Sequence, residues 1–383
     1  MAMLPLTPKL ASEAALYAYV TQTAAADKIH ENVPLIAARK FDFQGGLVSG
    51  ISGTVIDRMF DRRTGFAVIG QGRPNTPYDG HHIVAIRGTA TLKDAVTDAH
   101  CGVTNAPNNH PCHAGFFRTF DSMAGTLEKY FLAAKRKTGG LKVHCVGHSL
   151  GGALANLTAN MLTQPPYSAE VNLYTFGSPR VGVAAYPGAT ESATKKIYRS
   201  TNGSDPVALV PVWPFRHAGS ELCLDGACLI NPMAHKMTRY IQNAAVYQDY
   251  GQISNYGAAL DPAPLRLKEQ DRHQVQCSAL WEKRLFRALR TYIMDAGLSR
   301  LQVGFSAALT FYDVLAKEME ETAKASDTLA AQQRGLLACM LSFVGKSAMA
   351  VGELTYRFIR SVFQMVLDKL ASLAKTALGM LSD

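Results

Sequence analysis

Apolar positions alternate between helical and strand-like spacing through the first 260 residues. Residues 9–27, 114–136 and 150–162 are typical of helices, with apolar side chains three or four positions apart. Short apolar runs at 66–69, 82–87, 141–146, 171–176 and around 196–200 predict strands. Strands that alternate with helices in this way form parallel βαβ units, so we expect an α/β fold with a mostly parallel central sheet.

The pattern changes near residues 261–264, where the chain reads Asp-Pro-Ala-Pro. Beyond this point proline and strand signals nearly vanish, and apolar residues at 281–293 and 354–373 predict amphipathic helices. We therefore expect one domain over 1–258 and an α-helical C-terminal extension over 259–383. Either the extension packs its apolar face on the preceding domain, or it serves as a membrane-surface or partner-binding module.

The composition excludes several classes of protein. A chain of 383 residues that is 48% hydrophobic and 18% charged is not disordered, collagen-like or a mini-protein. Its net charge of +9 suits an anionic surface such as phospholipid, whereas nucleic-acid motifs are missing, so we expect no nucleic-acid partner. We see neither a conventional secretory signal nor an apolar stretch of the ~20 residues that a membrane-spanning helix needs.

Two pairs of cysteines lie close together in loop-like sequence, Cys101 with Cys112 and Cys223 with Cys228. Pairing of each would suit an oxidising compartment, and free thiols would suit a cytosol, so both states stay open. A metal cluster of Cys101, His110, Cys112 and His113 matches no zinc spacing. For that loop we favour a disulfide.

The strongest chemical signal is the run Gly147-His-Ser149-Leu-Gly151, which stands between a predicted strand and a predicted helix. A serine on such a tight turn points out of the carboxyl edge of the sheet, and flanking glycines relieve the clashes there. The backbone N–H of Leu150, at a helix N-terminus, can stabilise a developing oxyanion. Ser149 is therefore our candidate nucleophile.

A nucleophilic serine needs a base and an acid that orients it, in the order Ser, Asp or Glu, His. Asp205 follows a predicted strand in an Asn-Gly-Ser-Asp-Pro turn. Among the later histidines we favour His235, which precedes a predicted helix, with His217 as its main competitor and His273 in a charged stretch beyond the domain change. Thr89, at the end of an earlier strand, is the candidate second oxyanion donor.

Several segments together resemble the class 3 (fungal-type) lipase family: Ile86-Arg-Gly-Thr89, residues 146–155, Thr175-Phe-Gly-Ser-Pro-Arg-Val-Gly182, Asn202-Gly-Ser-Asp-Pro-Val207 and residues 235–240. The resemblance runs from about residue 60 to 245 and implies an α/β-hydrolase fold over 1–258. It implies Ser149, Asp205 and His235 as a triad, Thr89 and Leu150 as the oxyanion hole, and a movable lid over residues 91–99 and the loop to Phe116.

These observations predict a serine ester hydrolase that acts on lipid acyl esters and requires no metal or organic cofactor. The motifs do not choose between phospholipid, as in a phospholipase A, and acylglycerol; the basic charge favours a phospholipid surface. Bacterial lipases of this type with extensions include exported toxins, which implies an immunity protein or delivery machinery as partner, and export without a signal peptide. The alternatives are a catalytically silent binding or scaffold protein of the same fold and an esterase for small soluble esters.

Overall fold

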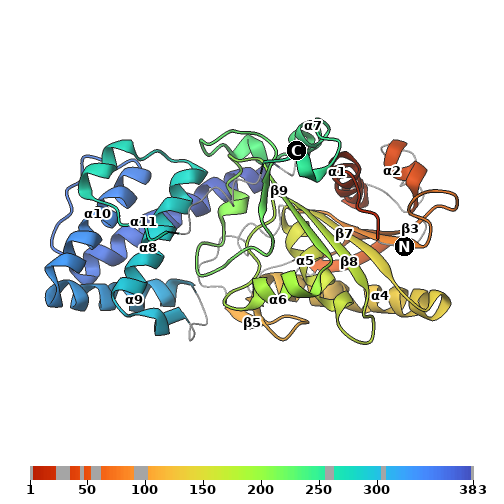
Figure 1. Cartoon of the computed structure of the whole chain (residues 1–383), viewed down its shortest axis with the longest axis horizontal. Helices are drawn as coiled ribbons and strands as arrows, with labels where there is room; N and C mark the ends of the chain where they lie inside the picture. Colours follow the sequence, from red (N-terminus) through yellow and green to blue (C-terminus); the bar gives the residue numbers. More distant parts are fainter. Residues whose placement is uncertain are drawn as a thin grey trace.

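A mostly parallel sheet forms the centre of the larger, α/β part of the molecule (Figure 1). The computed structural model describes residues 3–22, 35–43, 47–52, 62–89, 102–254, 263–302 and 308–380. Within these ranges eight strands form one sheet in the order β1-β3-β4-β7-β8-β9-β10, with β2 paired to β3. They are β1 (Phe41–Asp42), β2 (Leu47–Ser52), β3 (Arg62–Gly72), β4 (His81–Ile86), β7 (Lys142–His148), β8 (Glu170–Phe176), β9 (Lys196–Thr201) and β10 (Glu221–Cys223).

All pairings from β4 to β10 are parallel, while β1, β2 and β4 each pair with β3 in the antiparallel sense. Two further strands, β5 (Val103–Asn105) and β6 (Pro111–His113), form a separate antiparallel pair. The α/β-hydrolase class expected from the sequence is thereby confirmed. The antiparallel edge was not predicted.

Side-chain alternation along the central strands separates two hydrophobic cores. On β7, Val143 and Cys145 belong to one core, and Val146 belongs to the other. On β8 the same alternation divides Leu173 from Tyr174. Because successive side chains of a strand point to opposite faces, both faces of these strands must be covered by helices.

Helices cover both faces of the sheet in the α/β part. Two of them, α4 (Ala114–Thr138) and α5 (Leu150–Thr163), pack on the first core, and α1 (Pro8–Tyr17) and α7 (Met237–Ala244) pack on the second. The shorter elements are η1 (Ala18–Gln22), α2 (Leu35–Lys40), α6 (Tyr186–Ala193), η4 (Val207–Leu209), η5 (Pro232–His235) and η6 (Tyr250–Gln252). The predicted helices at 114–136 and 150–162 are confirmed. Of the helix predicted over 9–27, residues 23–27 lie outside the described residues.

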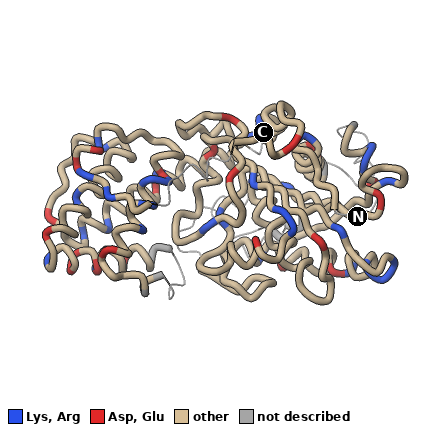
Figure 2. Tube along the Cα trace, in the orientation of Figure 1, with Lys and Arg blue, Asp and Glu red and all other residues tan. Residues whose placement is uncertain are grey.

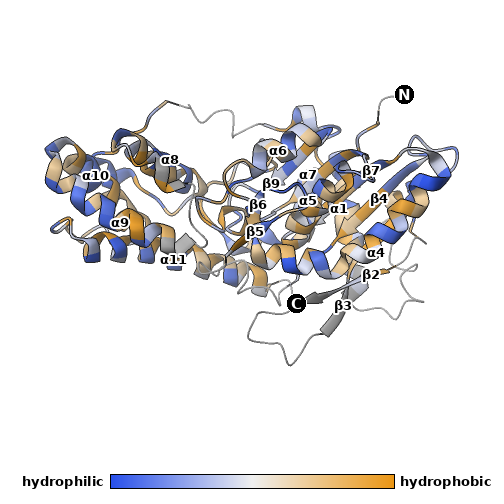
Figure 3. Ribbon diagram, turned by 90° about the horizontal axis from the view of Figure 1, so that it is seen from below, coloured by the Kyte–Doolittle hydropathy of each residue, from blue (hydrophilic) through white to orange (hydrophobic). Residues whose placement is uncertain are grey.

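The C-terminal region is helical, as predicted, and its helices pack on one another beside the α/β part (Figure 1). They are α8 (Ala279–Asp295), α9 (Ala308–Ala325), α10 (Asp327–Phe343) and α11 (Tyr356–Gly379), with the short η7 (Glu269–Gln274) and η8 (Ser299–Gln302). Hydrophobic and hydrophilic residues alternate around these helices (Figure 3). Ser278, Ser326 and Thr355 cap α8, α10 and α11 by accepting a hydrogen bond from the backbone N–H three residues later.

The C-terminal helices contact the segments that follow Asp205. Phe311 of α9 packs edge-on against Trp213, with ring centroids 4.8 Å apart, and the Tyr312 hydroxyl donates to the Trp213 carbonyl at 2.7 Å. Helix α11 contacts both η4 and η5. Val207, Val210 and Trp213 share one connected hydrophobic cluster with residues of α8, α9, α10 and α11. The extension therefore packs on the α/β part, which was the first of the two alternatives.

Cys223 and Cys228 are free thiols, the first buried and the second exposed, so the pairing considered for them is absent. Cys101 lies outside the described residues, so its pairing with Cys112 stays a prediction. In the part of the chain that the structure describes, no group of histidine, cysteine and carboxylate side chains is placed to hold a metal ion. The same part contains no helix with the length and apolar character needed to cross a bilayer.

Candidate active site

Ser149 occupies a strained turn between β7 and α5. Its backbone has φ 58° and ψ −133°, a region that residues other than glycine rarely adopt. The turn is held by the Ser149 N–H, which donates to the carbonyl of Phe176 at the end of the neighbouring strand β8, at 2.9 Å. Strain of this kind persists only where surrounding structure enforces it, and it is common at functional sites.

The two glycines that flank Ser149 allow the close approach of backbone that this turn needs. A Cβ atom on Gly147 would lie 2.0 Å from the carbonyl oxygen of Gly151. A Cβ atom on Gly151 would lie 2.1 Å from the carbonyl oxygen of Ile86, on β4. Neither backbone atom can move aside, so both positions require glycine, as the motif predicted.

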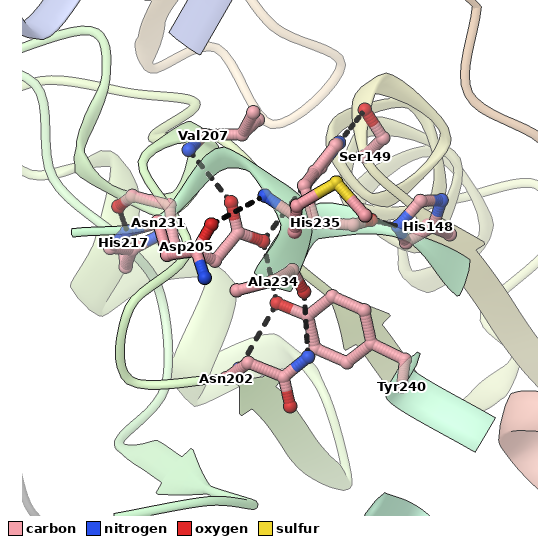
Figure 4. Close-up of polar contacts among 12 residues, drawn as sticks. His148, Ser149, Asn202, Asp205, Val207, His217, Asn231, Ala234, His235 and Tyr240 are labelled. Atoms are coloured by element: carbon pink, nitrogen blue, oxygen red, sulfur yellow. Dashed lines mark hydrogen bonds and ion pairs between the residues drawn. The ribbon is translucent and has the colours of Figure 1, made fainter. Parts of the chain in front are cut away.

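Ser149, His235 and Asp205 form one chain of hydrogen bonds (Figure 4). His235 Nε2 lies 2.8 Å from Ser149 Oγ, and His235 Nδ1 lies 2.8 Å from Asp205 Oδ2. Because the carboxylate only accepts, Nδ1 carries the proton and Nε2 is left to accept the serine hydroxyl proton. Ser149 and His235 are 0% exposed and Asp205 is 1% exposed, which shields these hydrogen bonds from water.

The Asp205 carboxylate is oriented by two further donors. It lies just beyond β9, and its Oδ1 accepts from the Val207 N–H at 2.8 Å. Its Oδ2 accepts from the Tyr240 hydroxyl at 2.6 Å. Burial, reinforced by the charge of Asp205, raises the pKa of Tyr240 well above its ordinary value, so the phenol stays protonated and continues to donate.

The loop that carries His235 is attached to the loop that carries Asp205. The Asn231 N–H donates to the Ser204 carbonyl at 2.8 Å, and the Asn202 side chain donates to the Ala234 carbonyl at 2.7 Å. Asn231 also caps η5 through its side chain, which accepts from Met233 N–H at 3.0 Å. These bonds position the imidazole between serine and aspartate.

His217, the competing candidate base, does not contact Ser149 in this arrangement. Its Nε2 donates to the Ala208 carbonyl at 2.8 Å, and its pKa is lowered by burial and then by Arg199 and Arg180. His273 is exposed on η7, in the helical region. The residue that contacts both partners is the favoured His235.

The candidate oxyanion donors flank the serine. Leu150 is the first residue of α5 and is fully buried. Thr89 follows Gly88, whose missing Cβ would lie only 2.7 Å from Ser149 Cβ, so this strand end lies against the nucleophile. Thr89 is itself 8% exposed. Residues 91–99 of the expected lid lie outside the described residues, whereas the rest of its loop, from residue 102 to Phe116, contains β5, β6 and the start of α4.

Sequence reasoning missed a second network, which links this strand end to His235. Tyr19 Oη accepts from Gly88 N–H at 3.1 Å and lies 2.6 Å from His148 Nδ1. His148 Nε2 lies 2.9 Å from the His235 carbonyl, which only accepts, so Nε2 carries the proton and the Tyr19 hydroxyl donates to Nδ1. Burial, followed by the charge of His235, lowers the pKa of His148 well below its ordinary value, so its ring stays neutral.

Part of this chain is similar in sequence to known lipases. Residues 83–215 match the family model for lipase (class 3). Over these residues the chain belongs to the class 3 lipase family. The class 3 lipase segment contains Thr89, Ser149, Leu150 and Asp205, whereas His235 lies 20 residues beyond its end.

Relatives of this class 3 lipase segment carry several names. A secreted mono- and diacylglycerol lipase 1 of Fusarium solani is 33% identical over 151 residues, or 38% of this chain and 45% of that protein. The toxin TseL of Vibrio cholerae is 33% identical over 102 residues, 26% and 15% of the two chains. A phospholipase A1-II 1 of Oryza sativa subsp. indica is 40% identical over 85 residues, 21% of each chain. The chain thus spans less than half the length of these relatives.

Among solved structures, a Rhizomucor miehei lipase in complex with its propeptide is similar to this chain at a TM-score of 0.42 and 22% identity. The alignment covers 56% of this chain and 67% of that one.

Proposed function

We propose that this protein is a serine lipase that hydrolyses acyl ester bonds of lipids. The observation that carries the proposal is the unbroken chain of hydrogen bonds from Ser149 Oγ through His235 to Asp205, at 2.8 Å each, on a serine held at positive φ. A buried nucleophile, base and carboxylate in this order are the parts of an acyl-transfer site.

We also propose the division into a lipase domain over 1–258 and a helical extension over 259–383.

In the proposed reaction, His235 Nε2 takes the proton of Ser149 as Oγ attacks the ester carbonyl carbon. The imidazolium that forms is stabilised by Asp205, which Val207 and Tyr240 hold in place. His235 then gives its proton to the leaving alcohol, and an acyl-serine remains. Water, activated by the same imidazole, attacks the acyl-serine and releases the fatty acid.

The negative charge that develops on the carbonyl oxygen requires preorganised donors. We assign this role to the backbone N–H of Leu150, at the positive end of the α5 dipole, and to Thr89. Removing one such donor typically lowers kcat by about 10²–10³-fold. No metal or organic cofactor takes part in this scheme.

The proposed substrates are phospholipids, cut as by a phospholipase A, or acylglycerols. The names of the Fusarium and Oryza relatives support lipid esters of both kinds, and the net charge of +9 favours an anionic phospholipid surface. Because Ser149 has no exposed surface, a lipid reaches it only after a covering segment has moved.

The test is release of fatty acid from phosphatidylglycerol, phosphatidylethanolamine and triacylglycerol, with the cleaved acyl position resolved. Ser149→Ala should abolish release, while His217→Gln should retain it. A fluorophosphonate should label the wild type but not Ser149→Ala. Turnover of a short soluble ester without any lipid would favour the esterase, and neither labelling nor turnover would favour a silent binding protein.

The similarity to the toxin TseL supports one further proposal on biological role, namely that the substrate is the membrane of a competing cell and that an immunity protein is the partner. Expression in a bacterial periplasm should then slow growth, and Ser149→Ala should relieve the effect. Equal growth of the two strains would refute this role and would leave the lipase assignment unchanged.

A further inference from the structure

A cavity of about 510 Å³ lies where helix α8 meets the segment that follows η4. Its size falls within the ~300–1,000 Å³ typical of small-molecule sites, and such sites often lie between two parts of a protein. Ser149, Asp205 and His235 do not appear among its described lining residues. Those that carry the argument are Arg216, Phe286, Arg290 and Met294.

The described lining contains five cationic side chains and two carboxylates. Both carboxylates already have partners: Glu282 pairs with Arg180 at 2.9 Å, and Asp295 pairs with Arg266 at 2.8 Å. Elsewhere, basic and acidic residues are interspersed over both parts of the molecule (Figure 2). Arg180 and Lys283 are in turn paired with Glu282 and Glu221, so the surplus of cationic side chains in this lining comes from α8 and the segment after η4.

Arg216, on the segment after η4, and Arg290, on helix α8, line the same cavity. The pKa of Arg216 is lowered by burial and then by the positive charge of Arg290. Within the described ranges, neither guanidinium has an ion pair with a carboxylate. Two like charges that approach without a counterion repel each other, and an anion between them removes the repulsion.

Most of the remaining lining is apolar. Trp213, Phe215 and Phe286 are buried at 5%, 3% and 7% exposure, and Met294 of α8 is 65% exposed. A cavity with guanidinium groups beside an apolar wall fits a ligand with both an anionic and a hydrocarbon part. An acidic protein segment would instead be met by a broader and flatter surface.

We propose that this cavity is an accessory site for an anionic amphiphile, specifically a phospholipid whose phosphate lies between Arg216 and Arg290 and whose hydrocarbon part lies against Phe286 and Met294. The site is separate from the nucleophile, so its occupancy does not depend on hydrolysis. It would hold the enzyme on an anionic lipid surface through helix α8.

The experiment uses the full chain carrying Ser149→Ala, so that lipid is bound and not consumed. Binding of short-chain phosphatidylglycerol below its critical micelle concentration is measured by calorimetry, and binding to phosphatidylcholine vesicles with and without phosphatidylglycerol by sedimentation. Arg216→Gln combined with Arg290→Gln should weaken both by at least tenfold. The matched control, Arg136→Gln with Arg357→Gln, removes the same charge from exposed positions and should change affinity less than twofold.

Four results would overturn the proposal. An equal loss in the two double variants would mean that net charge alone acts. Displacement of the lipid by inorganic phosphate at the concentration at which the lipid itself binds would mean a free-anion site, and equal binding of poly-glutamate would mean an acidic protein partner. If the arginine double variant fails to fold, Met294→Glu, at an exposed position, should still weaken lipid binding, and unchanged binding in that variant also overturns the site.

None of these results depends on the proposed lipase function, because the binding assay uses the Ser149→Ala chain. Failure of hydrolysis in the wild type and failure of binding here are therefore separate outcomes.

Discussion

Replacing Tyr19 by phenylalanine tests whether the network behind the nucleophile positions the catalytic groups. The substitution removes the bond from the Tyr19 hydroxyl to His148 Nδ1, which spans 2.6 Å, and takes the acceptor away from the Gly88 N–H at 3.1 Å. The ring keeps its packing, so the change is confined to these two hydrogen bonds.

The magnitude follows from the two bonds. A lost neutral hydrogen bond costs about 0.5–1.5 kcal/mol, and a buried N–H left without an acceptor costs about 1–3 kcal/mol. The free energy of unfolding should fall by about 3 kcal/mol. Because Gly88 precedes Thr89 and His148 holds the His235 carbonyl, the candidate oxyanion donor and the base both lose support. We expect kcat to fall about tenfold with KM within about twofold, since Tyr19 is a positioning residue.

The assay is steady-state ester hydrolysis at a temperature where each variant is fully folded, together with urea unfolding. Tyr130→Phe is the matched control, because Tyr130 also bonds a histidine, His82 Nδ1 at 3.0 Å, away from the site. It should lose about 1 kcal/mol of stability and no kcat. If Tyr19→Phe loses stability but keeps kcat within twofold of the wild type, the network is structural only and the reasoning fails.

Three other outcomes follow from the described contacts. Asp205→Asn should lower kcat about 10⁴-fold by favouring the wrong tautomer of His235. In the same hydrolysis assay, His217→Gln should keep kcat within about threefold of the wild type. The reverse result would make His217 the base. Gly151→Ala places a Cβ atom 2.1 Å from the Ile86 carbonyl oxygen. It should lower the free energy of unfolding in urea by about 3 kcal/mol or more. The control Gly140→Ala, whose added Cβ has no atom within 4 Å, should leave this free energy unchanged. Burial lowers the pKa of His82 to about 4 and that of His113 to about 3, so below the unfolded value of about 6.5 only the unfolded chain takes up these protons. Stability should therefore fall as pH drops from about 6.5 to 4, by up to about 1.4 kcal/mol per pH unit for each histidine, and an unchanged slope of urea stability against pH in His82→Gln would contradict this.

The parts of the site that sequence predicted are those with a local signal. Gly147 and Gly151 are required by contacts within one turn and with the adjacent strand, so the motif carries the geometry of Ser149. The central strands were predicted because residues buried on both faces read as continuous apolar runs. The order of serine, aspartate and histidine then limited the base to three later histidines, and only the fold brings His235, rather than His217 or His273, to Ser149.

The parts that sequence missed depend on contacts between distant segments. Tyr19 meets His148 across 129 positions of the chain, and Tyr240 meets Asp205 across 35. The sequence around a tyrosine in a helical segment does not indicate which distant group its hydroxyl will bond. The short strands β1, β2 and β10 were missed because pairing with a neighbour, more than their own composition, defines them. The spacing of Cys223 and Cys228 likewise does not define the geometry that a disulfide needs.

One hydrophobic cluster contains Val207, Val210 and Trp213 together with residues of helices α8 to α11. The α/β part and the C-terminal helices therefore share a core, and the chain cannot be divided between them without exposing it. A truncation near residue 258 would uncover Val210 and Trp213, which are 3% and 5% exposed in the whole protein, and would strip α11 from the loops that follow Asp205 and carry His235. The α/β part therefore cannot be separated intact from the C-terminal helices, although its family resemblance ends well before those helices begin. Engineering that transplants the α/β part has to include the helical C-terminal region.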